Sequence, residues 1–265
     1  MKTNKQPSVS GQRWLLATAV GASVLLAGCA TGPNANPRDP LEPYNRTMFK
    51  FNDTLDKAVL EPVATGYQNV TPKPVRIAAT NFFSNLGELW SAVNNALQLK
   101  GEGTYNSVVR FTTNTVFGLG GLIDMAGAMG IERHKQDFGL TLGHWGVPSG
   151  AYVVWPLFGP STVRDSVGLW ADWQGDPVGH LHDVSARNSL YALRVVNIRA
   201  NLLSTTSLVE SAALDKYSFT RDAYLQLRQN AVRPRAQSEG SELDWMNESA
   251  PETVEAAPAD QSLKK

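Results

Sequence analysis

One segment, from Val116 to Ile131, limits the possible folds of this chain more than any other. Almost all of its residues are apolar or glycine, and Asp124 carries its only charge. A helix that crosses a bilayer needs ~20 apolar residues, so this segment is too short to span one. Its glycines also interrupt the period of a core helix. The segment suits close backbone packing, a hinge, or insertion into one leaflet, and a tight corner in an ordinary core is the simplest alternative.

The first 28 residues have the pattern of a bacterial lipoprotein signal peptide. A basic start precedes an apolar run at 14–26, and Leu26-Ala-Gly-Cys29 then fits the lipobox. Cys29 is the only cysteine, so its thiol would carry the lipid anchor and the mature chain would have no disulfide. The alternative is an ordinary secretory signal followed by a chance cysteine.

The residues that follow Cys29 indicate where the anchored protein would go. Ala30 stands where an Asp usually retains lipoproteins in the inner membrane of enteric bacteria, so the sequence favours the outer membrane. Residues 29–38 are rich in small residues and are expected to form a flexible, lipidated linker.

The composition is that of a globular protein with a polar end. Hydrophobic residues make up 42% and charged residues 18% of the chain. The formal net charge is zero, which removes the electrostatic case for nucleic-acid binding. The segment 232–265 is rich in Ala, Pro, Ser and acidic residues and cannot bury enough apolar surface to fold. We therefore expect one domain at 39–231 and a disordered acidic tail at 232–265.

Apolar residues at helical spacing predict a mostly α domain. The first helix is expected to begin with Asp39 as its N-cap and to end at Pro62. The segment Gly150 to Trp155 contains Ala-Tyr-Val-Val-Trp, the best strand candidate, and is bounded by glycine and proline, so we expect one short strand or hairpin element. Further helices are expected at 72–97, with Gly87 as a weak point, and at 105–117, 161–173, 184–203, 208–214 and 219–230.

The motifs of familiar catalytic sites are incomplete. Gly146-Val-Pro-Ser-Gly150 places its serine one position too late for a nucleophile elbow, and Gly118-Leu-Gly-Gly121 lacks the third glycine of a dinucleotide fingerprint. His180 and His182 have no acidic or cysteine partner at ligand spacing, which favours a surface or loop role. We therefore expect no catalysis, no cofactor and no metal.

Five motifs, taken in order, resemble the MlaA/VacJ family of lipoproteins. They are Asp39–Asn52, Asn114–Asp124, Phe138–Val147, Gly159–Asp165 and Asp215–Tyr224. The resemblance covers Cys29 to about Asn230 and leaves out the tail. It implies a single ring-like helical domain, embedded in one leaflet, with a channel at its centre.

The resemblance also implies a function. A member of this family would remove misplaced phospholipids from the outer leaflet of the Gram-negative outer membrane and pass them to the soluble periplasmic carrier MlaC. It would be anchored on the periplasmic side in the inner leaflet, associate with trimeric porins, and keep the membrane lipid-asymmetric. It would not be an enzyme. Two other classes stay open, a structural scaffold for porins and a lipid hydrolase.

The candidate channel or gate residues are Asn45, Arg46, Gly118, Gly120, Gly121, Asp124, Arg164 and Asp165. The three glycines can adopt positive φ and let backbones approach closely, so they would serve as a hinge if Leu122 to Ile131 moves. The adjacent Arg164 and Asp165 are more typical of a capping or structural ion pair than of a catalytic pair.

Overall fold

The protein folds into a mostly helical domain with one β-hairpin, in a computed structural model that describes residues 36–232. The elements are α2 (Glu42–Leu55), η1 (Asp56–Leu60), α3 (Glu61–Val70), α4 (Lys73–Leu97), α5 (Gly101–Val116), α6 (Met125–Ala128), α7 (Phe138–His144), β1 (Tyr152–Trp155), β2 (Gly159–Thr162), α8 (Val163–Gln174), η2 (Pro177–His180), α9 (Val184–Ala212) and α10 (Lys216–Val232). The predicted α fold with a short hairpin is confirmed. The predicted signal peptide, Cys29 and the tail from 233 onward lie outside the described residues, while Val232, assigned to the tail, is the last residue of α10.

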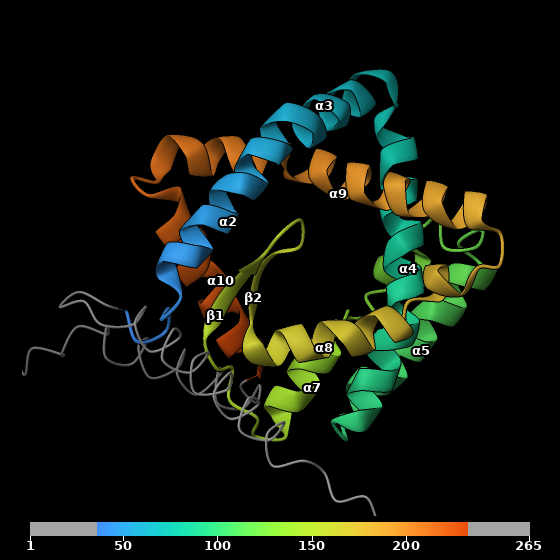
Figure 1. The fold of residues 1–265 in the computed structure, drawn as a ribbon. Helices are drawn as coiled ribbons and strands as arrows, with labels where there is room; N and C mark the ends of the chain where they lie inside the picture. Colours follow the sequence, from blue (N-terminus) through green and yellow to red (C-terminus); the bar gives the residue numbers. More distant parts are fainter. Residues whose placement is uncertain (1–35, 233–265) are drawn as a thin grey trace, which may run out of the picture.

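The helices form a ring around an opening, and the β-hairpin reaches into that opening (Figure 1). One side of the ring is α2 and α3, and α4 lies across the opening from α2, packed against α5. The long α9 joins the two sides because it contacts both α3 and α4. Helix α7 contacts α4, α8 and α10, which closes the ring below the hairpin.

The first helical rod does not end at Pro62, so that prediction is wrong. Helix α2 continues through η1, a π-helical turn, into α3, where Pro62 occupies the first turn. Proline has no N–H, so it cannot donate to the carbonyl four residues earlier. The wider turn accommodates this, since the N–H of Glu61 donates to the carbonyl of Asp56, five residues back.

The predicted N-cap role of Asp39 is also wrong. The cap position is occupied by Leu41, which makes no side-chain capping bond. Asp39 is instead buried at 2% exposure, where it accepts hydrogen bonds from Asn45, Tyr217 and Arg221. Two of these donors belong to α10, far away in the sequence, so a tertiary contact decides the position of Asp39.

The two helices predicted at 184–203 and 208–214 are one helix, α9. The polar run between them lies within the helix, and its hydroxyl groups bond back to carbonyls of the same helix. Thr206 Oγ1 donates to the carbonyl of Leu202 at 2.9 Å, and Ser207 Oγ donates to that of Ser204 at 2.8 Å. Helix α4 is likewise continuous through Gly87.

Short polar residues cap the starts of α6, α7, α8, η2 and α9. Asp137 accepts from the N–H of Leu140 at 2.8 Å at the start of α7, and Asp183 accepts from Ser185 at 2.8 Å at the start of α9. Thr162 caps α8, because its side chain accepts from the N–H of Asp165.

The small apolar core lies where the hairpin meets α2 and α10. Strands β1 and β2 are antiparallel, with Tyr152 opposite Thr162 and Trp155 opposite Gly159. Tyr152, Val154 and Tyr217 form a buried cluster. The core therefore fixes the base of the hairpin and leaves its tip exposed.

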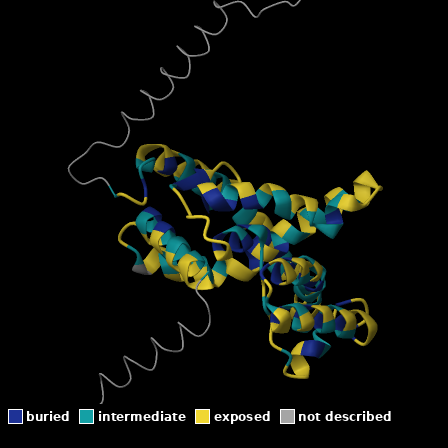
Figure 2. Cartoon of the chain, turned by 90° about the horizontal axis from the view of Figure 1, so that it is seen from below, coloured by how far each residue is buried: buried dark blue, intermediate teal, exposed yellow. Residues whose placement is uncertain are grey.

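The rest of the domain has an unusual distribution of polarity. Among residues 36–232, nineteen polar or charged residues are buried and only nine apolar ones. Many large apolar side chains are exposed, and exposed positions run along most of the elements (Figure 2). Soluble domains bury apolar residues and rarely bury charged ones. Within 36–232, the helices are each too short or too polar to cross a bilayer.

Candidate functional site

The glycine-rich segment leaves α5 through a left-handed turn. Residues 119, 120 and 121 have φ of +53°, +72° and +92°. A Cβ at Gly118 would lie 2.2 Å from the carbonyl oxygen of Ile123, and one at Gly121 would lie 2.6 Å from the side-chain nitrogen of Asn85. A Cβ at Gly120 would meet open space. Gly118 and Gly121 therefore allow close packing, while Gly120 serves only the backbone conformation.

Asp124 fastens the segment to α5. Arg110 Nη2 donates to both of its carboxylate oxygens at 3.0 Å, and Asn114 Nδ2 donates to Oδ1 at 3.0 Å. The N–H of Gly127 donates to the same oxygen at 2.9 Å. Burial alone would raise the pKa of Asp124, but the bonds from Gly127, Asn114 and Arg110 hold that pKa below its ordinary value. The carboxylate is thus ionised and fixed.

Arg110 is the centre of this arrangement and is only 5% exposed. It donates to the carbonyl of Ile131 at 2.7 Å and to Glu88 Oε1 on α4 at 3.1 Å. Arg133 Nε reaches the same Glu88 oxygen at 2.9 Å. Two guanidinium groups therefore balance two carboxylates, and one side chain ties α4, α5 and both halves of the glycine-rich segment together.

Asn45 and Asn52 fasten α2 to the backbone of β1. Asn45 Nδ2 donates to the carbonyl of Tyr152 at 3.0 Å, and the N–H of Val154 donates to Asn45 Oδ1 at 2.8 Å. Asn52 makes the same pair of bonds nearer the hairpin tip, at 2.9 Å and 2.8 Å. The two residues are seven positions apart, so they share one face of α2. Each side-chain amide thus forms the pair of backbone hydrogen bonds that a neighbouring strand would otherwise form with this part of the hairpin.

Arg46 joins α2 to the start of α10. It pairs with Asp215 and with Glu42, each at 2.8 Å, and its guanidinium lies 4.4 Å from the ring centre of Tyr217. These contacts pair the charge of Arg46 at the place where α2 meets the start of α10, so this side chain links the two helices.

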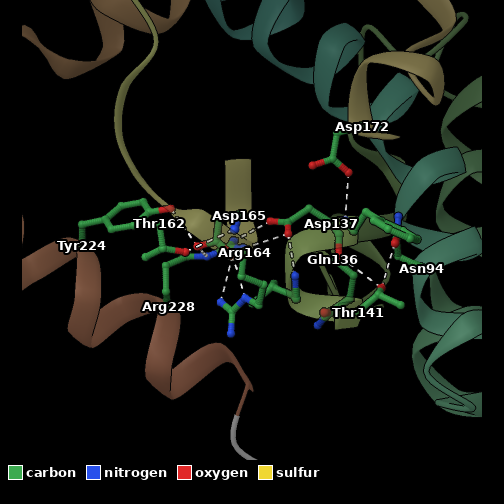
Figure 3. A network of polar contacts seen from close by, with 12 residues as sticks. Asn94, Gln136, Asp137, Thr141, Thr162, Arg164, Asp165, Asp172, Tyr224 and Arg228 are labelled. Atoms are coloured by element: carbon green, nitrogen blue, oxygen red, sulfur yellow. Dashed lines mark hydrogen bonds and ion pairs between the residues drawn. The ribbon is translucent and has the colours of Figure 1, made fainter. Parts of the chain in front are cut away.

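Arg164 and Asp165 belong to a buried network that joins α7, α8 and α10 (Figure 3). Arg164 Nε and Nη2 donate to Asp165 Oδ1 at 2.9 and 2.8 Å. Arg228 bridges Asp165 and Asp137, with Nη2 2.8 and 2.9 Å from their Oδ1 atoms, and Tyr224 donates to Asp165 Oδ2 at 2.9 Å. Burial would raise the pKa of Asp165, but Arg228 and Arg164 hold it below its ordinary value. The geometry is that of the structural ion pair, which the sequence favoured over a catalytic pair.

A cavity of about 520 Å³ lies between α4, α8, α9 and residues 133–137. These helices border the ring opening (Figure 1). Its apolar wall includes Phe83, Leu86, Trp173 and Ile198. Its charged side chains are Arg133, Lys135, Asp137, Asp172, Asp176 and Arg194. The cavity is thus amphipathic, and the eight residues expected to form a channel or gate do not line it.

The eight candidates occupy three separate places. The glycines and Asp124 lie at the end of α5, Asn45 and Arg46 lie on α2, and Arg164 and Asp165 begin α8. Their roles as channel or gate residues stay a prediction, while their contacts hold the ring and its hairpin in shape.

Sequence reasoning missed several residues that carry these contacts. The most important are Glu88, Arg110, Asn52, Asp172 and Arg228. A signal existed for two of them, because Arg110 continues a polar stripe of α5 at helical spacing with Ser107 and Asn114, and Asn52 repeats Asn45 after two turns. The others gained their partners through folding alone.

Known proteins have a similar sequence and a similar fold. The profile of the MlaA lipoprotein family matches residues 37–231. The intermembrane phospholipid transport system lipoprotein MlaA of Haemophilus influenzae is 35% identical over 225 residues, covering 79% of this chain and 86% of that one. The lipoprotein of the same name from Escherichia coli is 36% identical over 220 residues, covering 80% and 86%.

A solved structure is similar as well. It was described as the structural basis for maintenance of bacterial outer membrane lipid asymmetry, and it matches with a TM-score of 0.65 and 37% identity over 74% of this chain and 99% of that one. The family match runs from just before α2 to the end of α10. The chain therefore belongs to the MlaA lipoprotein family.

Proposed function

We propose that this protein sits in the inner leaflet of the outer membrane and passes misplaced phospholipids from the outer leaflet, through its ring, toward the periplasm. The observation that carries the proposal is the reversed polarity of the domain, which buries polar residues and exposes large apolar ones. The relatives named as phospholipid transport lipoproteins support it.

The physical argument concerns the two ends of a phospholipid. A charged head group is very costly to move through hydrocarbon, so its path needs polar walls. The tails need apolar surface instead. The cavity beside α4 offers charged and amide side chains next to Phe83, Leu86 and Trp173, and large apolar side chains are exposed on most of the helices. A ring with this distribution can guide the head group while the tails stay in lipid.

The lipid would then leave for a soluble periplasmic carrier of the MlaC type, and the ring would be held in place by a lipid on Cys29 and by trimeric porins. These partners are the ones that the resemblance to the family implies, and they are part of the proposal. The many large apolar side chains exposed on the domain support a membrane setting for them.

The test is lipid transfer from asymmetric proteoliposomes to purified carrier. We expect loss of labelled phospholipid from the outer leaflet and its appearance on the carrier, with no free fatty acid. Stable binding of porin without any transfer would favour the scaffold, and release of fatty acid would identify a hydrolase. Vesicles that contain porin alone provide the control.

Asn52→Ala is expected to free the hairpin tip without unfolding the ring. The change removes two hydrogen bonds to exposed backbone, worth about 0.5–1.5 kcal/mol each. Hydrogen exchange of the Leu157 amide should accelerate, and the melting temperature should fall only slightly. Thr54→Ala on the same helix is the control, because its hydroxyl bonds only to the carbonyl of Lys50. Unchanged exchange at Leu157 would show that Asn52 does not hold the tip.

Valine substitutions at Gly120 and Gly121 should separate conformation from packing. Both positions have positive φ, which costs a β-branched residue about 1–3 kcal/mol. Only at Gly121 does the new side chain also meet Asn85. We expect Gly120→Val to stay abundant with altered outer-leaflet phospholipid, and Gly121→Val to be less abundant. If the lipid defect follows abundance in both variants and in the matching alanines, the hinge role of these glycines is wrong.

A further inference from the structure

The cavity beside α4 contains two charged side chains that form no salt bridge within residues 36–232, although the charges of Asp137 and Arg228 both act on one of them, Asp172. Arg194 pairs with Asp176 at 2.7 Å, Arg133 pairs with Glu88 at 2.9 Å, and Asp137 pairs with Arg228. Over the described part of the chain, this leaves Lys135 and Asp172 without an ion pair among the charged side chains of the cavity. One is a cation and the other an anion.

Asp172 is held in place through only one of its oxygens. Trp90 Nε1 donates to Oδ1 at 2.7 Å, and the backbone N–H of Phe138 donates to the same atom at 2.9 Å. The carboxylate is half-buried, and burial raises its pKa in spite of these two bonds. Figure 3 shows one oxygen in the drawn contact and the other turned away from it. Oδ2 is thus left to accept from a group that enters the cavity.

Lys135 lies on the segment that also brings Phe138 to Asp172. Its side chain is exposed, and an ammonium on a flexible stem suits a phosphate group. The same cavity is also lined by Trp173, which is exposed, and by Phe83 and Ile198. An anion-binding group, a cation-binding group and an apolar wall therefore meet in one space.

We propose that Asp172 and Lys135 form a head-group subsite that selects phosphatidylethanolamine. Asp172 Oδ2 accepts a hydrogen bond from the primary ammonium, and Lys135 binds the phosphate. The inference rests on the proposed function and adds the class of lipid to it. A phosphatidylglycerol head group has a phosphate but no cation, so it gains only the contact with Lys135 and leaves a half-buried carboxylate unpaired.

The two residues are expected to have different effects. Asp172→Asn keeps an oxygen for Trp90 and Phe138 but removes the charge that attracts an ammonium. The ratio of bound phosphatidylethanolamine to phosphatidylglycerol should fall about three- to tenfold, in line with one charge-assisted hydrogen bond near a surface. Lys135→Gln should weaken binding of both lipids alike, because both carry the phosphate.

The experiment uses the full, lipidated chain reconstituted in vesicles with equal amounts of the two lipids. Lipid that stays bound after extraction into detergent is measured by mass spectrometry for the parent, D172N, K135Q and the control E102Q. Glu102 is an exposed acid in the first turn of α5, outside the cavity. Competition by free phosphoethanolamine and by glycerol phosphate on the parent protein gives a second measurement that needs no variant.

The results distinguish a failure of the head-group subsite from a failure of the proposed function. If the parent binds phospholipid without head-group preference, or if D172N and E102Q keep the same preference, the subsite is wrong and the proposed function stands. If the parent binds no phospholipid at all, both fail. Stronger competition by phosphoethanolamine, together with loss of preference in D172N alone, supports the subsite.

Discussion

Arg110→Met should lower the free energy of unfolding by about 3–5 kcal/mol, the usual effect of removing one partner from a buried ion pair. Arg110 is 5% exposed and contacts Glu88, Asp124 and the carbonyl of Ile131. Methionine fills similar space but leaves the Asp124 carboxylate without its guanidinium partner, and Glu88 keeps only Arg133. A typical domain is stable by about 5–15 kcal/mol, so a large share of the stability would be lost.

The loss should be greatest in the glycine-rich segment. Limited proteolysis is expected to cut between 117 and 131 before the rest of the ring, because Arg110 binds Asp124 and Ile131, which lie on either side of α6. The melting temperature in detergent gives the overall effect. Arg110→Lys should lie between the parent and Arg110→Met, since lysine keeps the charge but not the planar group whose Nε, Nη1 and Nη2 reach Glu88, Ile131 and Asp124 separately.

Lys50→Met is the matched control, because Lys50 is an exposed cation of α2 whose side chain forms no hydrogen bond or ion pair within residues 36–232. Its melting temperature should equal that of the parent. A stable Arg110→Met variant with an unchanged pattern of proteolysis would contradict the central role of this side chain.

Cys29→Ala should abolish lipidation and, with it, function at the outer membrane. Cys29 is the only cysteine, and the lipobox around it is complete. Each buried CH₂ of an acyl chain contributes about 0.8 kcal/mol, so several chains hold a lipoprotein almost permanently. Without them, the uncleaved apolar run at 14–26 should keep the protein at the inner membrane.

Metabolic labelling with palmitate and separation of the two membranes measure this result. Thr31→Ala, two residues into the linker, is the control and should be labelled and sorted normally. A Cys29→Ala variant that is processed, reaches the outer membrane and restores its barrier would show that the anchor is unnecessary.

The local features of this fold could be predicted from the sequence. Thr162 caps α8, Tyr152 to Trp155 form a strand, and α4 and α5 lie where apolar spacing placed them. These features depend on a few neighbouring residues, so the local sequence suffices to specify them. The motifs that resemble a known family added the ring, because a family pattern contains tertiary information that spacing lacks.

The continuity of the helices and the polar interior were decided by tertiary structure. Pro62 is tolerated because a π-helical turn precedes it, and that turn is held by Arg199 of α9, which binds Asp56 at 2.7 Å. Asp39 does not cap the helix, because its carboxylate accepts hydrogen bonds from Tyr217 and Arg221 instead. The local sequence around Pro62 and Asp39 thus did not decide their roles. Those roles depend on contacts with residues more than a hundred positions away in the sequence.

The candidate site shows the same division. The sequence by itself indicated a glycine turn after α5, where Gly120 and Gly121 have positive φ and Gly118 does not, and it determined which chain end carries the anchor motif. It did not determine that Glu88, Arg110 and Asp124 meet, or that Lys135 and Asp172 share a cavity. A buried charge is stable only beside its partner, and an unpaired charge can be recognised only once every other charge has been assigned. Both conditions depend on distances between residues of different elements, which are fixed when the ring closes.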